Sequence, residues 1–261
     1  MRPGFMRFSG KSLAAVLLCA AFGARGQTAM TVGELKARLE AIRAATDFRA
    51  SGRLVRVAPS GERRSYQISM RARWFAGSVK LFCEITDPPP ARARLLLEIP
   101  AAGPASIRTG HAGDPRPATV PFESWGDALL ETAFTYEDLL ENQFQWRKQA
   151  LIGETRYGAR ACYLVRSAPD GDDHSQYATV TSWLDRESLY PVRVEKTLQS
   201  SGAVKEFLYY GLRQSRGVWS AGQIEVKTPG QPGSSLLIVT RGAEKAHVAA
   251  AEFEAALLTR P

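Results

Sequence analysis

The sequence predicts a mainly β (α+β) protein whose strands form a meandering antiparallel sheet. Short runs of alternating apolar and polar residues recur through the second half at intervals of about ten to fifteen residues. Gly, Pro, Asp and Ser mark the reversals between those runs. Helical spacing is confined to a few short segments. The strand-like runs of the second half cover residues 159–166, 177–185, 192–199, 204–212, 223–227 and 236–241.

The first half begins with a predicted helix over residues 31–46. Thr31 and Glu34 have the spacing of a capping box, in which each side chain accepts a hydrogen bond from the other residue's backbone amide. Apolar residues at helical spacing follow on one stripe, so we expect this stripe to pack on the sheet. They are Val32, Leu35, Leu39 and Ile42.

Three strands are predicted next, followed by a long loop. Apolar and polar residues alternate over residues 66–74 and 79–86, and residues 92–99 form a third strand-like run. Residues 100–121 are rich in Pro, Gly and Ala, which predicts mostly loop with one weak strand near residues 106–108.

Two further segments favour helices. Over residues 123–145 the apolar period becomes helical, which predicts two short helices with Glu137 and Asp138 on a solvated surface. Residues 244–258 are rich in Ala, and we expect them to close the chain as a final helix.

The N-terminus has the three parts of a secretory signal peptide. A basic start precedes an apolar stretch of about a dozen residues and then small residues ending at Gly26, with a competing cleavage site after Gly23. We expect residues 1–26 to be removed and residues 27–261 to form one domain in the periplasm. Leu18 stands where a lipidation signal requires a small residue before Cys19, so no lipid anchor is expected.

The charge balance and its distribution along the chain disfavour a nucleic-acid partner. The chain has 34 basic and 26 acidic residues, a net charge of +8, and loss of the four basic residues in residues 1–26 lowers it to +4. The remaining basic residues form no run, so we expect no nucleic-acid partner. A spanning helix needs roughly 20 apolar residues, so we also expect no transmembrane span in the mature chain.

Two cysteines outside the signal segment, Cys83 and Cys162, each lie in a strand-like run. In an oxidising compartment they could form a disulfide. Two isolated cysteines give no spacing signature, so two separately buried thiols are favoured over a disulfide. The sequence leaves both arrangements open.

No pattern in the chain is typical of an active site or of a cofactor. There is no G-x-S-x-G elbow, and the three histidines, His111, His174 and His247, are far apart in the sequence. Adjacent acids such as Glu137 and Asp138 lack the separation of a catalytic carboxylate pair. We therefore expect a protein that is not an enzyme and that binds neither a metal nor a cofactor.

The aromatic residues of the predicted strands indicate a ligand cavity. A sheet of ten or so strands has more apolar surface than the few predicted helices can cover, so part of that surface is expected to face a ligand. Five strand aromatics are the candidate lining residues: Trp74, Phe82, Tyr163, Trp183 and Tyr209.

Several segments of the chain form a recognisable series. They are FTYEDL at residues 134–139, GARACY at 158–163, SWLDRE at 182–187, YPVRVE at 190–195, Gly202, Lys205-Glu206, and GVW at 217–219. Together they resemble the LolA-like family of outer-membrane lipoprotein-sorting proteins. The resemblance extends over residues 31–241. The chain departs from the pattern after Trp219, where Ser220-Ala221 replace a Pro-containing step, and in its Pro/Gly-rich segment 100–121.

The resemblance implies a curved, incomplete antiparallel β-barrel, here of about 10–11 strands, with a few helices on its concave side. It implies a periplasmic, non-enzymatic carrier that binds lipid or lipoprotein acyl chains and takes them toward the outer membrane. An inner-membrane exporter of the RND type is the implied handover partner. The alternative is a LolA-like sensor or regulatory domain that binds a protein segment or lipid in envelope signalling.

Overall fold

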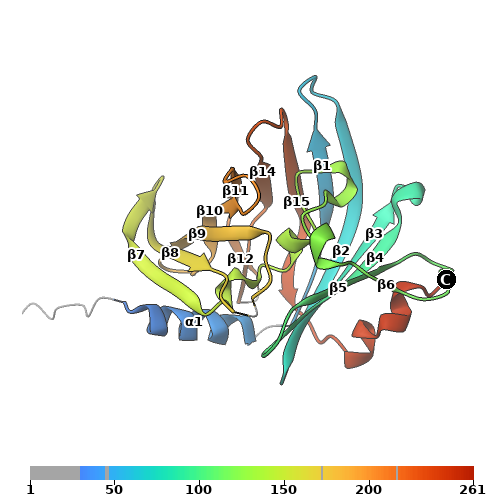
Figure 1. Cartoon of the computed structure of the whole chain (residues 1–261), viewed down its shortest axis with the longest axis horizontal. Helices are drawn as coiled ribbons and strands as arrows, with labels where there is room; N and C mark the ends of the chain where they lie inside the picture. Colours follow the sequence, from blue (N-terminus) through green and yellow to red (C-terminus); the bar gives the residue numbers. More distant parts are fainter. Residues whose placement is uncertain (1–29, 45–46, 172, 216) are drawn as a thin grey trace, which may run out of the picture. The chain divides into compact units, whose positions relative to one another are not determined.

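One open antiparallel sheet dominates the structure, a computed structural model that describes residues 30–261 except 45–46, 172 and 216 (Figure 1). Its 13 strands lie in the order β6-β5-β4-β3-β2-β1-β15-β14-β11-β10-β9-β8-β7, and β12 and β13 form a separate hairpin. The strands are β1 Phe48–Val57, β2 Arg63–Phe75, β3 Ser78–Asp87, β4 Ala93–Pro100, β5 Ser106–Gly110, β6 Ala118–Thr119, β7 Lys148–Tyr157, β8 Arg160–Ala168, β9 Tyr177–Asp185, β10 Pro191–Leu198, β11 Val204–Tyr210, β12 Arg213–Ser215, β13 Val218–Ser220, β14 Gln223–Lys227 and β15 Ser234–Lys245.

The sheet curves strongly but does not close, since β6 and β7 are its two edges (Figure 1). This confirms the prediction of a mainly β, incomplete antiparallel barrel, with more strands than expected. Thr31–Pro261 form one compact unit. The predicted signal segment, residues 1–26, lies outside the described residues.

The central strand β1 and the edge strand β7 are the two long strands that the sequence pattern did not predict. In β1, Gly52 faces the β15 backbone so closely that a Cβ atom there would lie 2.5 Å from the Ile238 carbonyl oxygen. The β1–β15 register also shifts between Ser51 and Gly52. A glycine at a bulge interrupts the alternation by which a strand is recognised.

The N-terminal helix, α1 Val32–Ala44, forms as predicted and has the capping box. The Thr31 amide donates to Glu34 Oε2 at 2.8 Å, and the Glu34 amide donates to Thr31 Oγ1 at 3.2 Å. Leu35 and Leu39 of the apolar stripe are buried, whereas Ile42 is exposed.

The prediction of two short helices over residues 123–145 is wrong. The structure has four single 3-10 turns there: η2 Phe122–Ser124, η3 Leu129–Glu131, η4 Glu137–Leu139 and η5 Asn142–Phe144. Left-handed backbone at Leu130, Glu131 and Glu141 interrupts any continuous helix. The helical spacing reflected apolar side chains that turn repeatedly into the concave side of the sheet.

The predicted final helix over residues 244–258 is also wrong. β15 continues to Lys245, and two 3-10 turns follow, η6 Ala250–Phe253 and η7 Ala255–Leu258. Arginines of the sheet hold this C-terminal segment by its backbone carbonyls. Arg73 donates to Val248 O at 2.7 Å and Arg71 to Glu252 O at 3.0 Å. Extended backbone at Ala249 and Glu254, with ψ 149° and 135°, interrupts any continuous helix.

The C-terminal segment covers the convex face of β3 and β4. Phe253 and Leu258 are buried there against Phe82 and Leu96 in a second hydrophobic cluster. Residues on either side of Phe82 in β3, such as Leu81 and Cys83, belong instead to the main core. This separation follows from the alternation of side chains in a strand.

The two cysteines are separate, buried thiols. Cys83 lies in β3 and Cys162 in β8, and both are free. Burial, with a smaller contribution from Glu84, raises the pKa of the Cys83 thiol to about 12. Of the two arrangements left open by the sequence, the structure therefore has the buried thiols.

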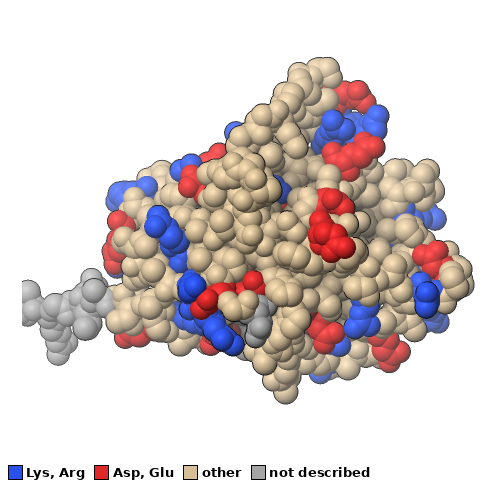
Figure 2. Space-filling model, in the orientation of Figure 1, with Lys and Arg blue, Asp and Glu red and all other residues tan. Residues whose placement is uncertain are grey.

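The surface charges of the described residues are mixed. On the face seen in Figure 2, basic and acidic side chains lie interspersed between larger uncharged areas. Many of them pair, as Arg64 does with Glu131 at 2.9 Å and Arg186 with Glu154 at 2.8 Å. Exposed pairs of this kind each contribute about 0–1 kcal/mol to stability, so the fold depends on the apolar core.

Candidate functional site

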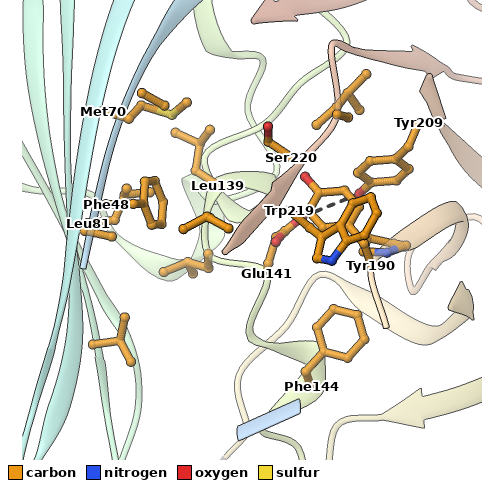
Figure 3. A pocket seen from close by; sticks show the side chains of 18 of the residues that line it. Phe48, Met70, Leu81, Leu139, Glu141, Phe144, Tyr190, Tyr209, Trp219 and Ser220 are labelled. Carbon is orange, nitrogen blue, oxygen red and sulfur yellow. Dashed lines mark hydrogen bonds between the residues drawn. The ribbon is translucent and has the colours of Figure 1, made fainter. Parts of the chain in front are cut away.

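An apolar cavity of about 360 Å³ lies on the concave side of the sheet (Figure 3). Its walls come from the concave face of β1–β4, β10, β11, β14 and β15, from α1, from residues 134–145, from the β9–β10 turn and from the β12–β13 hairpin. Ligand-binding pockets have volumes of about 300–1,000 Å³ and are mainly apolar with a few polar groups. The cavity meets both criteria.

The wall formed by β1–β3 is entirely apolar. Met70, Ala72 and Trp74 alternate on one face of β2, and Ala50 of β1 is the cross-strand partner of Met70. The rings of Phe48 and Trp74, which both line this wall, lie 6.2 Å apart. The alanines leave room between larger neighbours, and that is the local reason for a cavity in place of a filled core.

The opposite wall combines aromatic rings with polar groups. In Figure 3, Tyr190, Tyr209, Trp219 and Phe144 lie on the side of Glu141, across the cavity from Phe48, Met70 and Leu81. The Tyr209 hydroxyl donates to Glu141 Oε1 at 3.4 Å. Burial first, and then the Glu141 charge, raises the pKa of Tyr209 well above its ordinary value, so Tyr209 stays a neutral donor.

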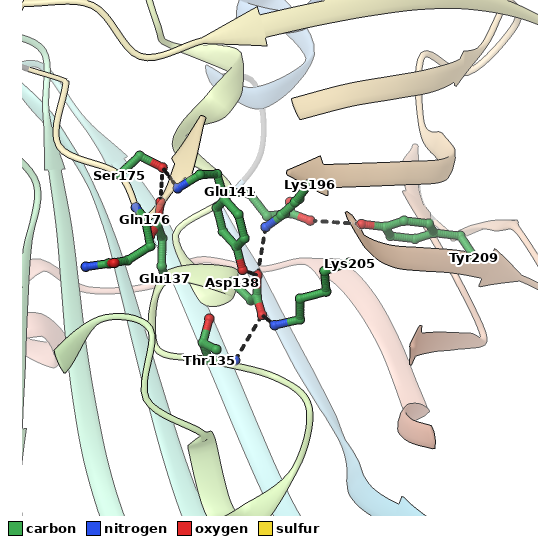
Figure 4. A network of polar contacts seen from close by, with 10 residues as sticks. Thr135, Glu137, Asp138, Glu141, Ser175, Gln176, Lys196, Lys205 and Tyr209 are labelled. Atoms are coloured by element: carbon green, nitrogen blue, oxygen red, sulfur yellow. Dashed lines mark hydrogen bonds and ion pairs between the residues drawn. The ribbon is translucent and has the colours of Figure 1, made fainter. Parts of the chain in front are cut away.

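A buried ion cluster forms part of this wall (Figure 4), since Asp138 and Lys196 both line the cavity. Asp138 is its centre, and two lysines of neighbouring strands pair with its two carboxylate oxygens. Lys196 Nζ of β10 lies 2.9 Å from Oδ1, and Lys205 Nζ of β11 contacts Oδ2. The Tyr177 hydroxyl donates to Oδ1 at 2.7 Å and the Thr135 amide to Oδ2 at 2.9 Å.

The protonation state of Asp138 follows from these partners. Burial by itself would raise the pKa of the carboxyl group, but the charges of Lys196 and Lys205 and the bonds from Lys205 and Tyr177 outweigh it and hold the pKa well below its ordinary value. Lys196 Nζ also lies 4.6 Å from the centre of the Phe207 ring. Asp138 is thus a fully ionised, fully paired group that ties residues 134–145 to the sheet.

Glu137 forms a second buried contact beside the first. Its Oε2 accepts from the Gln176 amide at 2.7 Å, and its Oε1 accepts from the Ser175 hydroxyl. Burial raises the pKa of Glu137 despite these hydrogen bonds. The expectation that Glu137 and Asp138 lie on a helix surface is therefore wrong, since their exposed fractions are 2% and 7%.

Two residues that line the cavity have left-handed backbone. Glu141 has φ 45° and Leu189 of the β9–β10 turn has φ 55°. Neither is a glycine, and such backbone costs of order 1–3 kcal/mol in a residue with a side chain. This backbone conformation directs the Glu141 side chain toward the cavity.

Of the five aromatics expected to line a cavity, the structure brings Trp74 and Tyr209 together at this one. Phe82, Tyr163 and Trp183 do not line it. Phe82 points to the convex face, where it packs under the C-terminal segment. The alternation in the sequence does not show which face of each strand lies on the concave side of the sheet.

The other two aromatics make contacts outside the cavity. Tyr163 of β8 is buried, with the Arg186 guanidinium 5.3 Å from its ring centre. Trp183 pairs across strands with Arg193, whose guanidinium lies 4.8 Å from the indole. Arg193 is in turn the cross-strand partner of Leu208, and cross-strand partners point to the same face of the sheet. Tyr209 follows Leu208 in β11 and points to the other face, so Trp183 and Tyr209 lie on opposite faces.

The polar residues of the site were not found from the sequence. Asp138 and Lys205 lie within the segments that carry the family resemblance, and this resemblance is the sequence feature that could have identified them as site residues. Their pairing needed the strand register, because Asp138 and Lys205 are 67 positions apart in the sequence.

The fold and the cavity together define a class: an open, curved β-sheet protein with an apolar site on its concave side. This is the LolA-like fold. A family model described as "Uncharacterized protein" matches residues 116–260, more than half of the chain, and the chain belongs to that family. A search of curated proteins gives no match.

Solved structures establish the fold. A domain assigned as an outer-membrane lipoprotein-sorting protein, from Vibrio parahaemolyticus, matches 87% of this chain and 97% of its own length, with a TM-score of 0.78 and 15% identity. A DUF1329 family protein from Desulfovibrio piger matches the same shares with a TM-score of 0.77 and 14% identity. A LolA superfamily protein from Nitrosomonas europaea matches 88% of this chain and 100% of its own, with a TM-score of 0.67 and 15% identity.

Two further properties of the described residues concern metal binding and membrane insertion. Within that part of the chain, no three His, Cys, Asp or Glu side chains are grouped so that they could hold a metal ion. None of its helices has both the length and the apolar character needed to span a membrane.

Proposed function

We propose that the protein is a periplasmic, non-enzymatic carrier that binds acyl chains of lipids or lipoproteins in the concave cavity and takes them toward the outer membrane. The observation that supports this most directly is the apolar cavity of about 360 Å³ between β1–β4 and residues 134–145. The signal-like residues 1–26 support the location, and the LolA-like fold supports the kind of ligand.

The energetics of such binding are favourable. Each methylene removed from water contributes about 0.8 kcal/mol, so burial of ten methylenes contributes roughly 8 kcal/mol before the ordering costs are subtracted. A carrier needs no covalent step. It needs an apolar cavity that a chain can enter and leave.

Handover to or from an inner-membrane exporter of the RND type is part of the proposal and is supported by the family resemblance. A pull-down from inner membranes that contain RND-type exporters, with this protein as bait, tests this part. Recovery of no exporter would remove the partner from the proposal and leave acyl binding standing.

The central experiment is native mass spectrometry of protein purified from its own periplasm. We expect a co-purified ligand whose mass and fragmentation identify an acyl chain. A protein that carries no ligand and that gives no saturable binding of a fluorescent fatty-acyl probe would contradict the proposal. Specific recovery of a single protein client in place of lipid would favour the sensor alternative.

A cavity-filling variant tests the site itself. Ala72 is 3% exposed and lines the cavity, so Ala72→Phe would place a ring in the space that the acyl chain needs. We expect probe binding to weaken at least about tenfold, a change of about 1.4 kcal/mol. The control is Ala161→Phe at an exposed position of β8, which should bind the probe as the unaltered protein does.

A further inference from the structure

The polar side of the cavity contains a carboxylate without a basic partner. Glu141 lines the cavity and has left-handed backbone at φ 45° and ψ 35°. Among the described residues, no Lys, Arg or His side chain lies within the 4.0 Å ion-pair distance of its carboxylate. The Tyr209 hydroxyl donates a hydrogen bond to Glu141 Oε1 at 3.4 Å. Glu141 therefore combines a strained backbone with a charge that has no ion-pair partner in the described part of the chain, at the wall of an apolar cavity.

The lysines of the nearby cluster are already engaged. Lys196 lies 2.9 Å from Asp138, its side chain is 4% exposed, and its ammonium lies against the Phe207 ring. Lys205 pairs with the other oxygen of the same carboxylate and is equally buried. Both ammonium groups pair with Asp138. Counted with Glu137 and Glu141, this region has two cationic side chains and three acidic ones, so it has no excess of positive charge, whatever the protonation of Glu137.

This charge balance argues against an anionic head group in the cavity. An acyl carboxylate or a phosphate seated at this wall would lie beside the Glu141 carboxylate, and the lysine that lines the cavity, Lys196, already pairs with Asp138. A neutral head group would leave the Glu141 charge unmatched. A cation would complete the pair.

The aromatic rings on the same side favour a cation further. Tyr190 and Tyr209 lie with ring centres 6.0 Å apart and planes at 82°, which makes two walls of a corner. Trp219 and Phe144 line the cavity on this side as well (Figure 3). The face of an aromatic ring attracts a cation, and several rings around one space are the usual receptor for an ammonium group.

We infer that the cavity selects an amphiphile in which a positively charged nitrogen is joined to the alkyl chain, with the ammonium at Glu141 and the rings of Tyr190, Tyr209 and Trp219 and the chain along β1–β3. This rests on the proposed function, because it names the head group of the ligand that the carrier takes. A lipid amine and an acylated peptide with a free amino group share this chemistry.

The test compares three ligands of equal chain length. Decyltrimethylammonium, decanol and decanoate are titrated by calorimetry into the purified protein after removal of bound lipid. We expect the ammonium compound to bind at least about fivefold more tightly than decanol, and decanoate to bind most weakly. Decylamine and a peptide acylated at a side chain, with its amino group free, then distinguish the two sources of the ammonium.

Two variants assign the preference. Glu141→Gln should abolish the advantage of the ammonium compound over decanol and leave decanol binding within about twofold. Tyr190→Leu should reduce the ammonium affinity more than the decanol affinity. The matched control is Glu131→Gln, because Glu131 is also left-handed, at φ 58°, but is exposed and pairs with Arg64 at 2.9 Å outside the cavity.

The outcomes separate the two proposals. If all three ligands bind equally, or decanoate binds most tightly, the head-group inference is wrong while the acyl carrier stands. If none of them binds, the proposed function fails and the inference fails with it. A Glu141→Gln variant that folds normally by thermal melting and keeps the full ammonium preference would also overturn the inference.

Discussion

Lys196 Nζ lies 2.9 Å from Asp138 Oδ1, and this contact joins a 3-10 turn to a strand 58 positions further along the chain. Both side chains are almost fully buried. The contact connects the polar support of the cavity wall to the concave face of the sheet. Its loss would leave a charge in an apolar interior, and that makes it the most sensitive polar contact to test.

Asp138→Asn should lower the free energy of unfolding by about 3–5 kcal/mol, because two buried ammonium groups lose their shared countercharge. Urea denaturation followed by tryptophan fluorescence measures the change. Asp127→Asn, at an exposed position of the same segment, is the control and should change stability by about 0.5 kcal/mol or less. Equal effects of the two substitutions would show that the buried cluster adds nothing to stability.

The same contact should give the stability a defined pH dependence. The pKa of Asp138 is lower in the folded protein than in the unfolded chain, so its contribution is complete above about pH 5 and is lost as the pH falls through the folded pKa. The stability difference between the unaltered protein and Asp138→Asn should therefore shrink as the pH falls from 5 towards about 2. A difference that is constant over this range would contradict the assignment of Asp138 as an ionised, paired group.

The C-terminal segment should be essential for stability and irrelevant to ligand selection. Phe253 is 3% exposed and meets the Phe75 ring edge to face at a centre distance of 5.7 Å. Phe253→Ala should cost about 3–5 kcal/mol by leaving a cavity on the convex face. Phe122→Ala, at a ring that is 38% exposed, is the control and should cost less. At a temperature where Phe253→Ala is folded, its probe affinity should equal that of the unaltered protein.

The Cys83 and Cys162 thiols should be unreactive in the native state. Burial raises the pKa of Cys83 to about 12, and a thiol must ionise to react. A thiol-specific chromogenic reagent at pH 8 should therefore label Cys83 and Cys162 only after denaturant is added. Fast labelling of Cys83 in the folded protein, located by peptide mass spectrometry, would show that β3 opens far more readily than its burial implies.

The strands that could be predicted from the sequence are those with an uninterrupted alternation, such as β2, in which Met70, Ala72 and Trp74 share a face. β1 escaped prediction because Gly52 and a register shift interrupt its pattern. Residues 123–145 were predicted as helices because helical spacing and repeated inward turns place apolar residues at similar intervals. Only the contacts with the sheet distinguish the two.

The site was less predictable than the fold for a physical reason. An aromatic residue in a strand is equally compatible with either face, so Phe82 and Trp74 looked alike in the sequence although they lie on opposite faces. The ion cluster depends on the pairing of β10 with β11, which brings Lys196 and Lys205 together as cross-strand partners. Sequence spacing does not carry that register.

The open edges of the sheet have a mechanical consequence. A closed barrel is a ring of ladder bonds, and its lumen can widen only if some of those bonds break. Here β6, a strand of two residues, and β7, which has a bulge near Gly153, end the ladder without meeting. The two halves of the sheet can therefore hinge apart with every strand pair intact. Entry and exit of a cargo chain then cost contacts across the concave space, and none of the hydrogen bonds that pair the strands.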